Sequence, residues 1–266
     1  MRCSGLVDDT VTVLIGGEAG QGISRSGMLL GKAMMRGGFY SYGAIDYPSL
    51  IRGGHNFYTV RGSSRKVYAN SGKLDLVVAL NRESVFRHMD EINPGGGIIY
   101  DEKEAISDEE LSRKDINFYP VPLSDVVKEL GGPSIMRNTV ALGSVSALVG
   151  LDVNILNELI SETFEGRDKI ISMNVEAIQK GWESVIEFNY GFKCTIEAGG
   201  RKERLWLTGN EAVALGAQAA GCNFFAAYPM TPASAVLHYY AGHDEETDSV
   251  VVQTESEIAA MCMIVG

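Results

Sequence analysis

Continuous apolar runs, each followed by a segment with helical spacing, constrain the fold of this chain most strongly. The run VTVLI (11–15) precedes the helical pattern of residues 21–35, and DLVVAL (75–80) precedes that of residues 82–92. Two more runs follow at 96–101 and 116–123. Strands that are apolar on both faces are typical of a parallel sheet covered by helices. The sequence therefore predicts an α/β fold: a mostly parallel sheet with helices on both faces.

The segment between the first two strand–helix units lacks helical spacing. HNFYTVRG (55–62) followed by KVYAN (66–70) predicts an antiparallel pair of strands added to the sheet. Farther along, residues 137–188 place apolar side chains at three- and four-residue intervals. We expect these helices to form the outer layer of the first domain.

A domain boundary is predicted near Gly199, in a charged segment with few helix signals. The first domain is then 1–195 and the second is 196–266. The second repeats the strand–helix order, with Thr208 or Asn210 as the N-cap of its first helix. Two strands and three helices in about 60 residues bury too little surface for ordinary stability. We therefore expect the second domain to be incomplete, truncated or completed by another chain.

Charge and cysteine spacing exclude several functions. The net charge of −11 disfavours nucleic acid as a partner, because a phosphate backbone would be repelled. The four cysteines form no C-x-x-C pair, so neither a zinc site nor an iron–sulfur cluster is predicted. The sequence shows no apolar run of the ~18 residues that a membrane span needs and no signal peptide, so we expect a cytoplasmic protein without membrane contact.

The glycine-rich stretch GGEAGQGI (16–23) lies between the first strand and the first helix. A dinucleotide fingerprint starting at Gly20 and Gly22 would need a small third residue, where this chain has Arg25. No Walker A loop is present either. A nest of backbone N–H groups around Gly20, Gln21 and Gly22 that binds an anion stays open. A structural turn is the favoured interpretation, and Glu18 argues against bound phosphate.

Two segments of the second domain are candidate sites. Glu255 and Glu257 follow an apolar strand, and Glu257 begins a helix, where a carboxylate can face a cofactor. From spacing alone, an acidic residue that only complements the helix dipole is the favoured alternative. In YPMTP (228–232) the prolines would hold the Thr231 hydroxyl toward a ligand. The alternative is an ordinary loop, because Tyr-Pro and Thr-Pro are common in loops.

Arg52, followed by Gly53 and Gly54, could approach a phosphate or carboxylate closely, as in a contact to coenzyme A. An ion pair of Arg52 that supports a loop between domains explains this residue equally well. The four histidines, His55, His88, His238 and His243, show no metal-ligand spacing, so no metal site is predicted. We expect His88, in an amphipathic helix, to lie at the surface.

Two sets of motifs together resemble one enzyme family. The pattern G-x-x-G-Q-G-I, YPSLIRGGHN (47–56) and DLVVALN (75–81) resemble the gamma domain of 2-oxoacid:ferredoxin oxidoreductases. GNEAVALGAQAAGC (209–222), YPMTPAS (228–234) and QTESEIAAM (253–261) resemble the start of the pyrimidine-binding alpha domain. The resemblance covers residues from about 11 to 266, in the order gamma then alpha that many of these enzymes share.

The resemblance implies an oxidative decarboxylation of a 2-oxoacid with thiamine diphosphate. The acyl group passes to coenzyme A, and electrons pass through iron–sulfur clusters to ferredoxin. Glu257 would then be the catalytic carboxylate that bonds the aminopyrimidine ring, with Pro229 also at the cofactor. Thr231 would contact the substrate carboxylate, next to Tyr228. The gamma-then-alpha order favours 2-oxoglutarate over pyruvate.

The chain also departs from the family pattern. The Gly-Asp-Gly motif that holds the diphosphate and its magnesium is absent, as are cluster-binding cysteines. The resemblance assigns both to a separate beta chain, so we expect this polypeptide alone to be inactive. The alternative is a non-catalytic module that binds a nucleotide or coenzyme A at residues 17–22.

Overall fold

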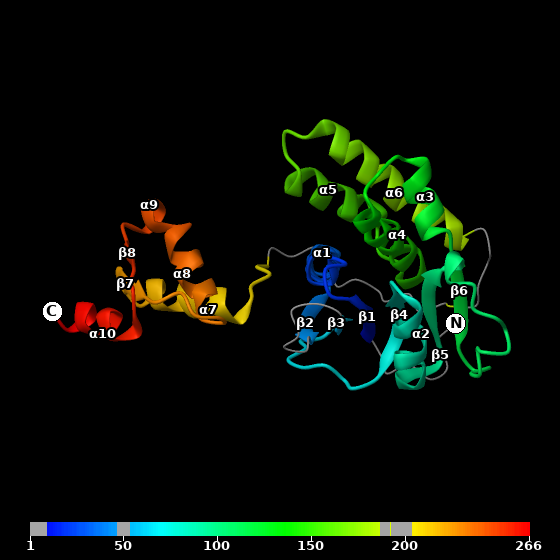
Figure 1. Cartoon of the computed structure of the whole chain (residues 1–266), viewed down its shortest axis with the longest axis horizontal. Helices are drawn as coiled ribbons and strands as arrows, with labels where there is room; N and C mark the ends of the chain where they lie inside the picture. Colours follow the sequence, from blue (N-terminus) through cyan, green and yellow to red (C-terminus); the bar gives the residue numbers. More distant parts are fainter. Residues whose placement is uncertain (1–9, 47–53, 187–191, 193–203) are drawn as a thin grey trace. The chain divides into compact units, whose positions relative to one another are not determined.

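The run VTVLI lies inside β1 (Thr10–Glu18), at the centre of a six-stranded sheet with the order β2-β3-β1-β4-β5-β6 (Figure 1). The computed structural model describes residues 10–46, 54–186, 192 and 204–266. The chain divides into two compact units, Met1–Arg204 and Leu205–Gly266. The predicted boundary between 195 and 196 falls outside the described residues, so it stays a prediction.

Five of the six strands in the sheet of the first unit share one direction. β1 pairs in parallel with β4, β4 with β5 and β5 with β6, whereas β3 runs antiparallel to both β1 and β2. The predicted α/β class with a mostly parallel sheet is confirmed. The other strands are β2 (Tyr40–Asp46), β3 (His55–Ser63), β4 (Leu74–Ala79), β5 (Ile92–Asp101) and β6 (Asn117–Val121).

The predicted antiparallel pair is only half right. β3 forms where expected, but its partners are β1 and β2, and residues 66–70 adopt no strand. β2 has a mixed sequence, YSYGAID, because it lies at the edge of the sheet and is only partly buried. It therefore lacks the continuous apolar pattern that marks the central strands.

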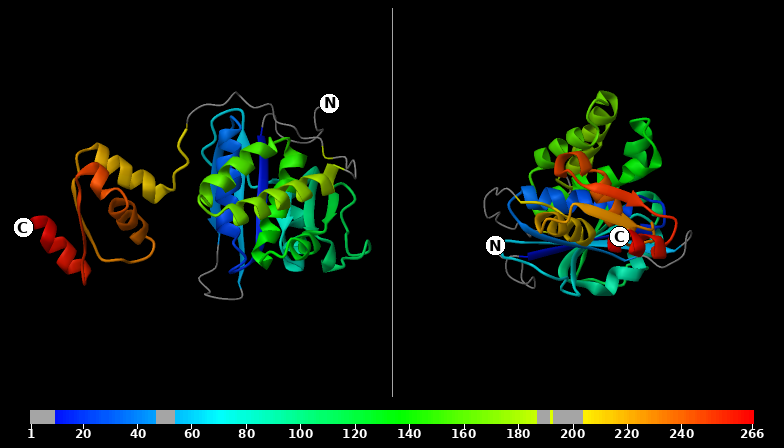
Figure 2. Two further views of the ribbon diagram at one scale, coloured as in Figure 1. Left: turned by 90° about the horizontal axis from the view of Figure 1, so that it is seen from above. Right: turned by 90° about the vertical axis from the view of Figure 1, so that its left-hand side faces the viewer.

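Helices cover both faces of this sheet, as the right-hand view of Figure 2 shows. One face packs against α1, α4 and their neighbours, and the other against α2 and the short turn η1. The helical elements of the first unit are α1 (Ile23–Arg36), α2 (Arg82–His88), η1 (Met89–Glu91), η2 (Glu102–Glu104), α3 (Leu123–Glu129), η3 (Ser134–Met136), α4 (Arg137–Val149), α5 (Val153–Thr163) and α6 (Asp168–Ile186).

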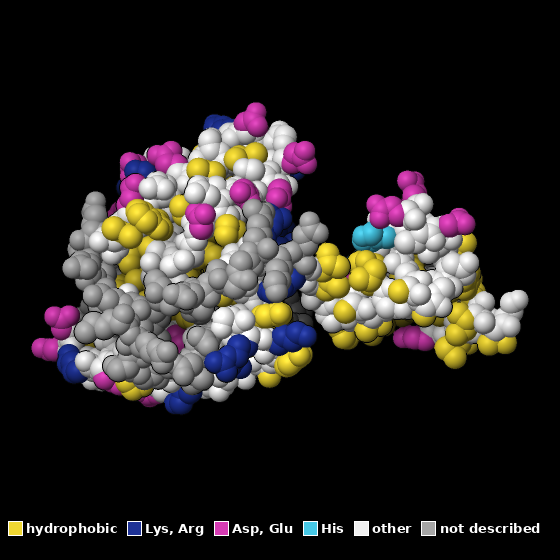
Figure 3. Space-filling model, turned by 180° about the vertical axis from the view of Figure 1, so that it is seen from behind, with side chains coloured by type: hydrophobic (Ala, Val, Ile, Leu, Met, Phe, Trp, Pro, Cys, Tyr) yellow, Lys and Arg dark blue, Asp and Glu magenta, His cyan; other side chains and the backbone are white. Residues whose placement is uncertain are grey.

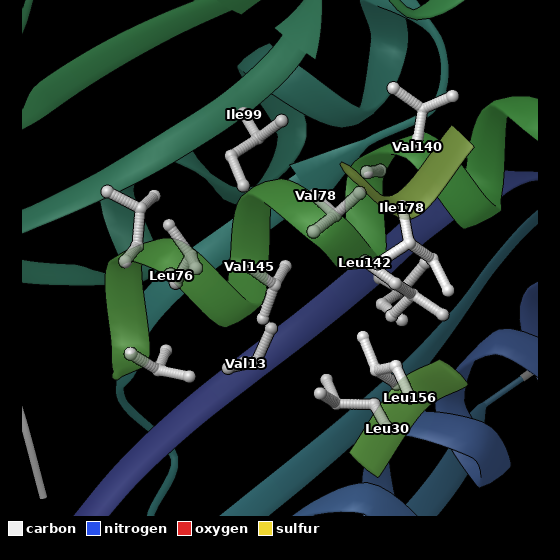
Figure 4. Close-up of a cluster of buried hydrophobic side chains, with 14 of the residues drawn as sticks. Val13, Leu30, Leu76, Val78, Ile99, Val140, Leu142, Val145, Leu156 and Ile178 are labelled. Atoms are coloured by element: carbon white, nitrogen blue, oxygen red, sulfur yellow. The ribbon is translucent and has the colours of Figure 1, made fainter. Parts of the chain in front are cut away.

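The helices predicted in 137–188 are confirmed, but α4 does not belong to an outer layer. Its side chains are buried along most of its length, and Leu142 and Val145 join one apolar cluster with Val13 of β1 (Figure 4). Small residues let α6 approach closely, since Ser144 Oγ donates to the carbonyl of Gly181 at 2.7 Å. α4 is therefore a core helix, and α6 carries the polar outer face.

The second unit contains a two-stranded parallel sheet of β7 (Phe224–Ala227) and β8 (Val250–Gln253). Thr208 caps the first helix in a capping box with Glu211, which confirms one of the two predicted N-caps. Tyr240 stacks on Phe225 with ring centroids 4.6 Å apart and anchors α8 to β7. The helices of the second unit are α7 (Gly209–Ala219), α8 (Ser234–Ala241), α9 (Asp244–Thr247) and α10 (Glu257–Val265).

Candidate functional site

The predicted residues of the second unit gather at the carboxyl edge of β7 and β8. Ala227 is paired with Gln253 in register, so the two loops that follow leave the sheet side by side. The amide of Thr254 donates to the carbonyl of Ala227 at 3.0 Å, one residue beyond the ladder. Because parallel strands end at the same edge, the YPMTP loop and the segment leading to Glu257 share one origin.

Glu257 opens α10 with its side chain exposed to solvent. Ser256 caps the helix by accepting the amide of Ala259 at 3.2 Å, which leaves the Glu257 carboxylate out of the capping interaction. Thr254, only 4% exposed, donates its hydroxyl to the carbonyl of Ser256 at 2.9 Å and fixes the turn. Among the described residues, the Glu257 carboxylate has no hydrogen-bonding or ionic partner, so it is free to meet an external group.

The YPMTP loop is a compact turn between β7 and α8. The amide of Met230 donates to the carbonyl of Tyr228 at 2.9 Å, and the amide of Ser234 donates to the carbonyl of Met230 at 2.9 Å. The peptide bond between Thr231 and Pro232 is cis. Tyr228 is 37% exposed and Thr231 is exposed, whereas Pro229 is half-buried. The loop therefore presents the phenol ring and the hydroxyl outward.

Sequence reasoning missed Asn210 as a part of this site. Its side-chain amide donates to the carbonyl of Pro232 at 3.1 Å and ties the YPMTP loop to the first turn of α7. The sequence offered Asn210 only as an alternative N-cap, a role that Thr208 takes. Because Thr208 caps the helix, the Asn210 side chain is available to bond the YPMTP loop.

Apolar side chains gather on the surface of the second unit (Figure 3). α10 has no buried residue although it is almost wholly apolar. Side chains that are exposed by 44% to 85% on this helix are Ile258, Met261, Met263, Ile264 and Val265. Met230 of the YPMTP loop is also 52% exposed. Large exposed apolar surfaces are typical of regions that another protein, a ligand or a membrane covers.

The glycine-rich turn of the first unit lies at the carboxyl end of β1. Gly20 and Gly22 have φ values of 94° and 77°, which only glycine adopts without strain. Gln21 folds back and accepts the amide of Glu18 at 2.8 Å, while its carbonyl accepts the Asn138 amide at 2.6 Å. These contacts account for the turn as a structural element.

Two features of this turn are nevertheless typical of ligand sites. α1 begins at Gly22 without a side-chain cap. The chain leaves β1 toward β2 and leaves the adjacent β4 toward β5, so the turn lies at a topological switch point, where open α/β sheets bind ligands. Arg52, the fourth residue predicted for an anion or coenzyme A contact, lies outside the described residues.

The expectation that His88 lies at the surface is wrong. His88 is 2% exposed, and its Nε2 lies 2.8 Å from Nε2 of His55. His88 is the last residue of α2 and follows the buried Ser84 by four residues, so it lies on the buried face of the helix, where it packs against Phe57. No spacing rule links two histidines 33 residues apart, so the sequence held no signal for this pair.

Residues 12–184 match the family described as pyruvate ferredoxin/flavodoxin oxidoreductase. The chain belongs to this family. Residues 215–266 match the thiamine diphosphate-binding domain of pyruvate flavodoxin/ferredoxin oxidoreductase. The enzyme family predicted from the motifs is therefore confirmed, and Tyr228, Thr231 and Glu257 fall in the second matched region.

Named relatives agree with this assignment. The chain is 29% identical to the alpha subunit of a 2-oxoacid:ferredoxin oxidoreductase from Sulfolobus sp, over 95% of this chain and 47% of the relative. The chain thus spans about half the length of such relatives. A solved 2-oxoglutarate:ferredoxin oxidoreductase from Magnetococcus marinus, with 2-oxoglutarate, coenzyme A and succinyl-CoA bound, is 32% identical with a TM-score of 0.87, covering 98% of this chain and 46% of its own.

The first unit also shares its fold with a separate subunit. The gamma subunit of a keto/oxoacid ferredoxin oxidoreductase from Geobacter sulfurreducens matches 66% of this chain and 99% of its own length, with a TM-score of 0.56 and 20% identity. Within the described ranges, no helix combines the length and apolar character that a membrane span requires.

Proposed function

We propose that this chain is an alpha-type subunit, with gamma and alpha regions in one polypeptide, of a thiamine diphosphate-dependent 2-oxoacid:ferredoxin oxidoreductase. The reaction is the oxidative decarboxylation of a 2-oxoacid to an acyl-CoA, with electrons passed to ferredoxin. The observation that carries the proposal is the exposed Glu257, unpaired among the residues that the structure describes, at the carboxyl edge of β7 and β8. It lies inside the region that matches a thiamine diphosphate-binding domain.

The residues present suit one half of a thiamine site. A thiamine pyrimidine needs a carboxylate that bonds a ring nitrogen, and when bound the cofactor supplies a carbanion that attacks the 2-oxo group. Glu257 can accept or donate that bond because no described residue occupies it. Pro229, at the start of the neighbouring loop, would border the same ring. Glu257 is then the group that holds a proton at the ring nitrogen.

The remaining half of the site would come from a beta subunit. We propose that this partner holds the diphosphate and its magnesium and carries the iron–sulfur cluster that reduces ferredoxin. The exposed apolar side chains around Glu257 support a protein partner here, since such a surface excludes water once it is covered. Subunit names among the relatives, such as the gamma subunit cited above, also describe multi-subunit enzymes.

For the substrate we propose a 2-oxoacid, with 2-oxoglutarate favoured over pyruvate. The similar enzyme with 2-oxoglutarate bound supports this preference. Thr231 and Tyr228 would contact the substrate carboxylate. In the complex, Thr231→Val should raise KM for the 2-oxoacid about tenfold, because one hydrogen bond to a charged group is lost, whereas Thr231→Ser should stay close to the wild type. Equal changes of KM in the two variants would show that the Thr231 hydroxyl does not bind the substrate.

Coenzyme A contact at the glycine-rich turn is part of the same proposal. Gly20, Gln21 and Gly22 place backbone groups at the switch point, next to the uncapped end of α1, and Arg52 would supply charge. A non-catalytic module that binds a nucleotide or coenzyme A is the second candidate. Calorimetry of the full chain without a partner separates the two, since tight binding to the isolated chain favours the module.

The decisive experiment compares two neighbouring carboxylates. The chain is purified with its beta subunit, and viologen reduction is measured with a 2-oxoacid and coenzyme A. Glu257→Gln should lower kcat by at least about 100-fold, as loss of a catalytic proton carrier does. The matched control, Glu255→Gln, changes an exposed carboxylate two residues away and should leave kcat within a few-fold. Retained activity in Glu257→Gln would overturn the assignment.

A further inference from the structure

His55 and His88 form a buried pair that the proposed reaction does not use. Their Nε2 atoms lie 2.8 Å apart, and the exposed fractions of the two residues are 9% and 2%. The rings lie 4.9 Å apart between centroids, and Phe57 packs against both. At 2.8 Å one of the two nitrogens must donate and the other must accept.

The partners of the pair fix the direction of that hydrogen bond. His88 Nδ1 lies 3.2 Å from a carboxylate oxygen of Glu91, which can only accept. His88 therefore carries its proton on Nδ1, and its Nε2 accepts. His55 must then donate from Nε2, which leaves its Nδ1 unprotonated. That atom is buried without a partner among the described residues, so the chain Glu91–His88–His55 ends in a free lone pair.

We propose that the His55–His88 contact is a proton-operated latch that holds the turn between β1 and α1. A first proton enters at His55 Nδ1 and keeps the contact, because His55 still donates from Nε2. A second proton on His88 Nε2 turns both facing nitrogens into donors. The 2.8 Å contact then cannot persist, and the rings must separate.

The latch lies at the base of the glycine-rich turn. His55 is paired with Glu18 at the end of the β1–β3 ladder. Directly beyond it, the amide of Ala19 donates to the carbonyl of Gly54 at 3.1 Å. The His55 ring also packs on Gly16, where an added Cβ would lie 3.3 Å from its Cε1 atom. Separation of the rings therefore pulls on the strand end that anchors the turn.

The charges that face the pair come mainly from α2 and η1. Burial is the largest cause that lowers the pKa of His55, and His88 and Arg87 lower it further. Glu83 and Glu91 oppose this shift, and Glu83 is itself paired with Arg87 at 2.9 Å. From β1, Glu18 is the residue opposite His55. Burial and these charges therefore disfavour the charged form of His55 while the two rings are in contact.

A direct test reads the position of the protons in the full-length chain. Long-range proton–nitrogen NMR correlations with labelled histidine should show, at about pH 8 where free imidazole is neutral, the proton of His88 on Nδ1 and that of His55 on Nε2. Any other combination of tautomers overturns the proposal, whatever any variant does.

A second measurement follows the turn itself. The hydrogen-exchange protection factor of the Ala19 amide should fall as the pH drops below about 6.5, by up to about tenfold per pH unit for each of the two protons that couple to opening. His55→Gln and His88→Gln should abolish this pH dependence, and either variant suffices if the other fails to fold. His238→Gln, which changes an exposed histidine of α8, should keep it. An unchanged pH profile in a folded latch variant would overturn the proposal.

Discussion

Gly143 of α4 and Gly181 of α6 each lie so close to the backbone of the opposite helix that neither can carry a side chain. A Cβ added to Gly143 would lie 2.0 Å from the carbonyl oxygen of Ile178, and one added to Gly181 would lie 1.9 Å from that of Val140. Both obstacles are backbone atoms, which cannot rotate away as a side chain can. The two helices are therefore in direct backbone contact.

Gly143→Ala should destabilise the first unit by at least about 2 kcal/mol, because overpacking a core against rigid backbone forces the helices apart. The free energy of unfolding, from urea denaturation followed by circular dichroism, measures the effect. Gly216→Ala is the control, since Gly216 is helical and an added methyl group meets open space. A loss in the control as large as in Gly143→Ala would contradict the packing argument.

Gly22→Ala should cost more stability than Gly20→Ala. Both glycines have positive φ, so each alanine pays about 1 kcal/mol of backbone strain. Only at Gly22 would the new Cβ also crowd a neighbour, 2.9 Å from the side chain of Ile135. Thermal unfolding of the two variants against the wild type measures the difference. Equal losses of stability would show that the Ile135 side chain moves aside without cost.

Asp75 should give the first unit a distinct response to pH. Burial raises the pKa of its carboxyl above the ordinary value, against the opposing hydrogen bonds from Asn93 and the amide of Thr12. A group whose pKa is raised on folding contributes its stability below the unfolded pKa of about 3.9, and loses it as pH rises through the folded pKa.

The stability of the wild type relative to Asp75→Asn should therefore be greatest in acid and shrink as the pH rises. Urea denaturation of both proteins across a pH series measures this difference. Since asparagine does not titrate, all other carboxyl groups cancel in the comparison. A difference that stays constant with pH would mean that burial leaves this carboxyl unshifted.

Thr208→Ala should weaken α7 by about 1 kcal/mol, because the capping box with Glu211 is lost. Asn210→Ala should cost less stability but should loosen the YPMTP loop, since it removes the contact with Pro232. Hydrogen exchange of the Ser234 amide, which donates to Met230, reports on the loop. Faster exchange of the Ser234 amide in Thr208→Ala than in Asn210→Ala would show that Thr208, rather than Asn210, supports the loop.

The sequence predicted the parts of the fold that depend on local pattern. VTVLI and DLVVAL form buried strands because both of their faces are covered, and the helices of 137–188 follow their apolar spacing. The sequence could not predict β2, because an edge strand needs no continuous apolar run. It also placed α4 in the wrong layer, since burial of α4 depends on glycine and serine contacts with α6 rather than on hydrophobic spacing.

The positions of the candidate-site residues could be predicted only in part, for a similar reason. Glu257, Tyr228 and Thr231 lie in short motifs after strands, and the common edge of parallel strands brings such segments together. The Asn210 side chain bonds a carbonyl group 22 residues away, and the histidine pair joins β3 to the end of α2 across 33 residues. Neither contact leaves a trace in the spacing of residues, so both became visible only in three dimensions.

The hydrogen bond between Thr254 and Ala227 gives the two loops of the candidate site a common starting point. The number of residues between this hydrogen bond and Thr231, or between it and Glu257, sets the position of each side chain. Inserting a single glycine before Thr231, or before Glu257, would shift one group against the other while leaving every side chain intact. In the proposed site, loop length is therefore as strict a requirement as the carboxylate of Glu257.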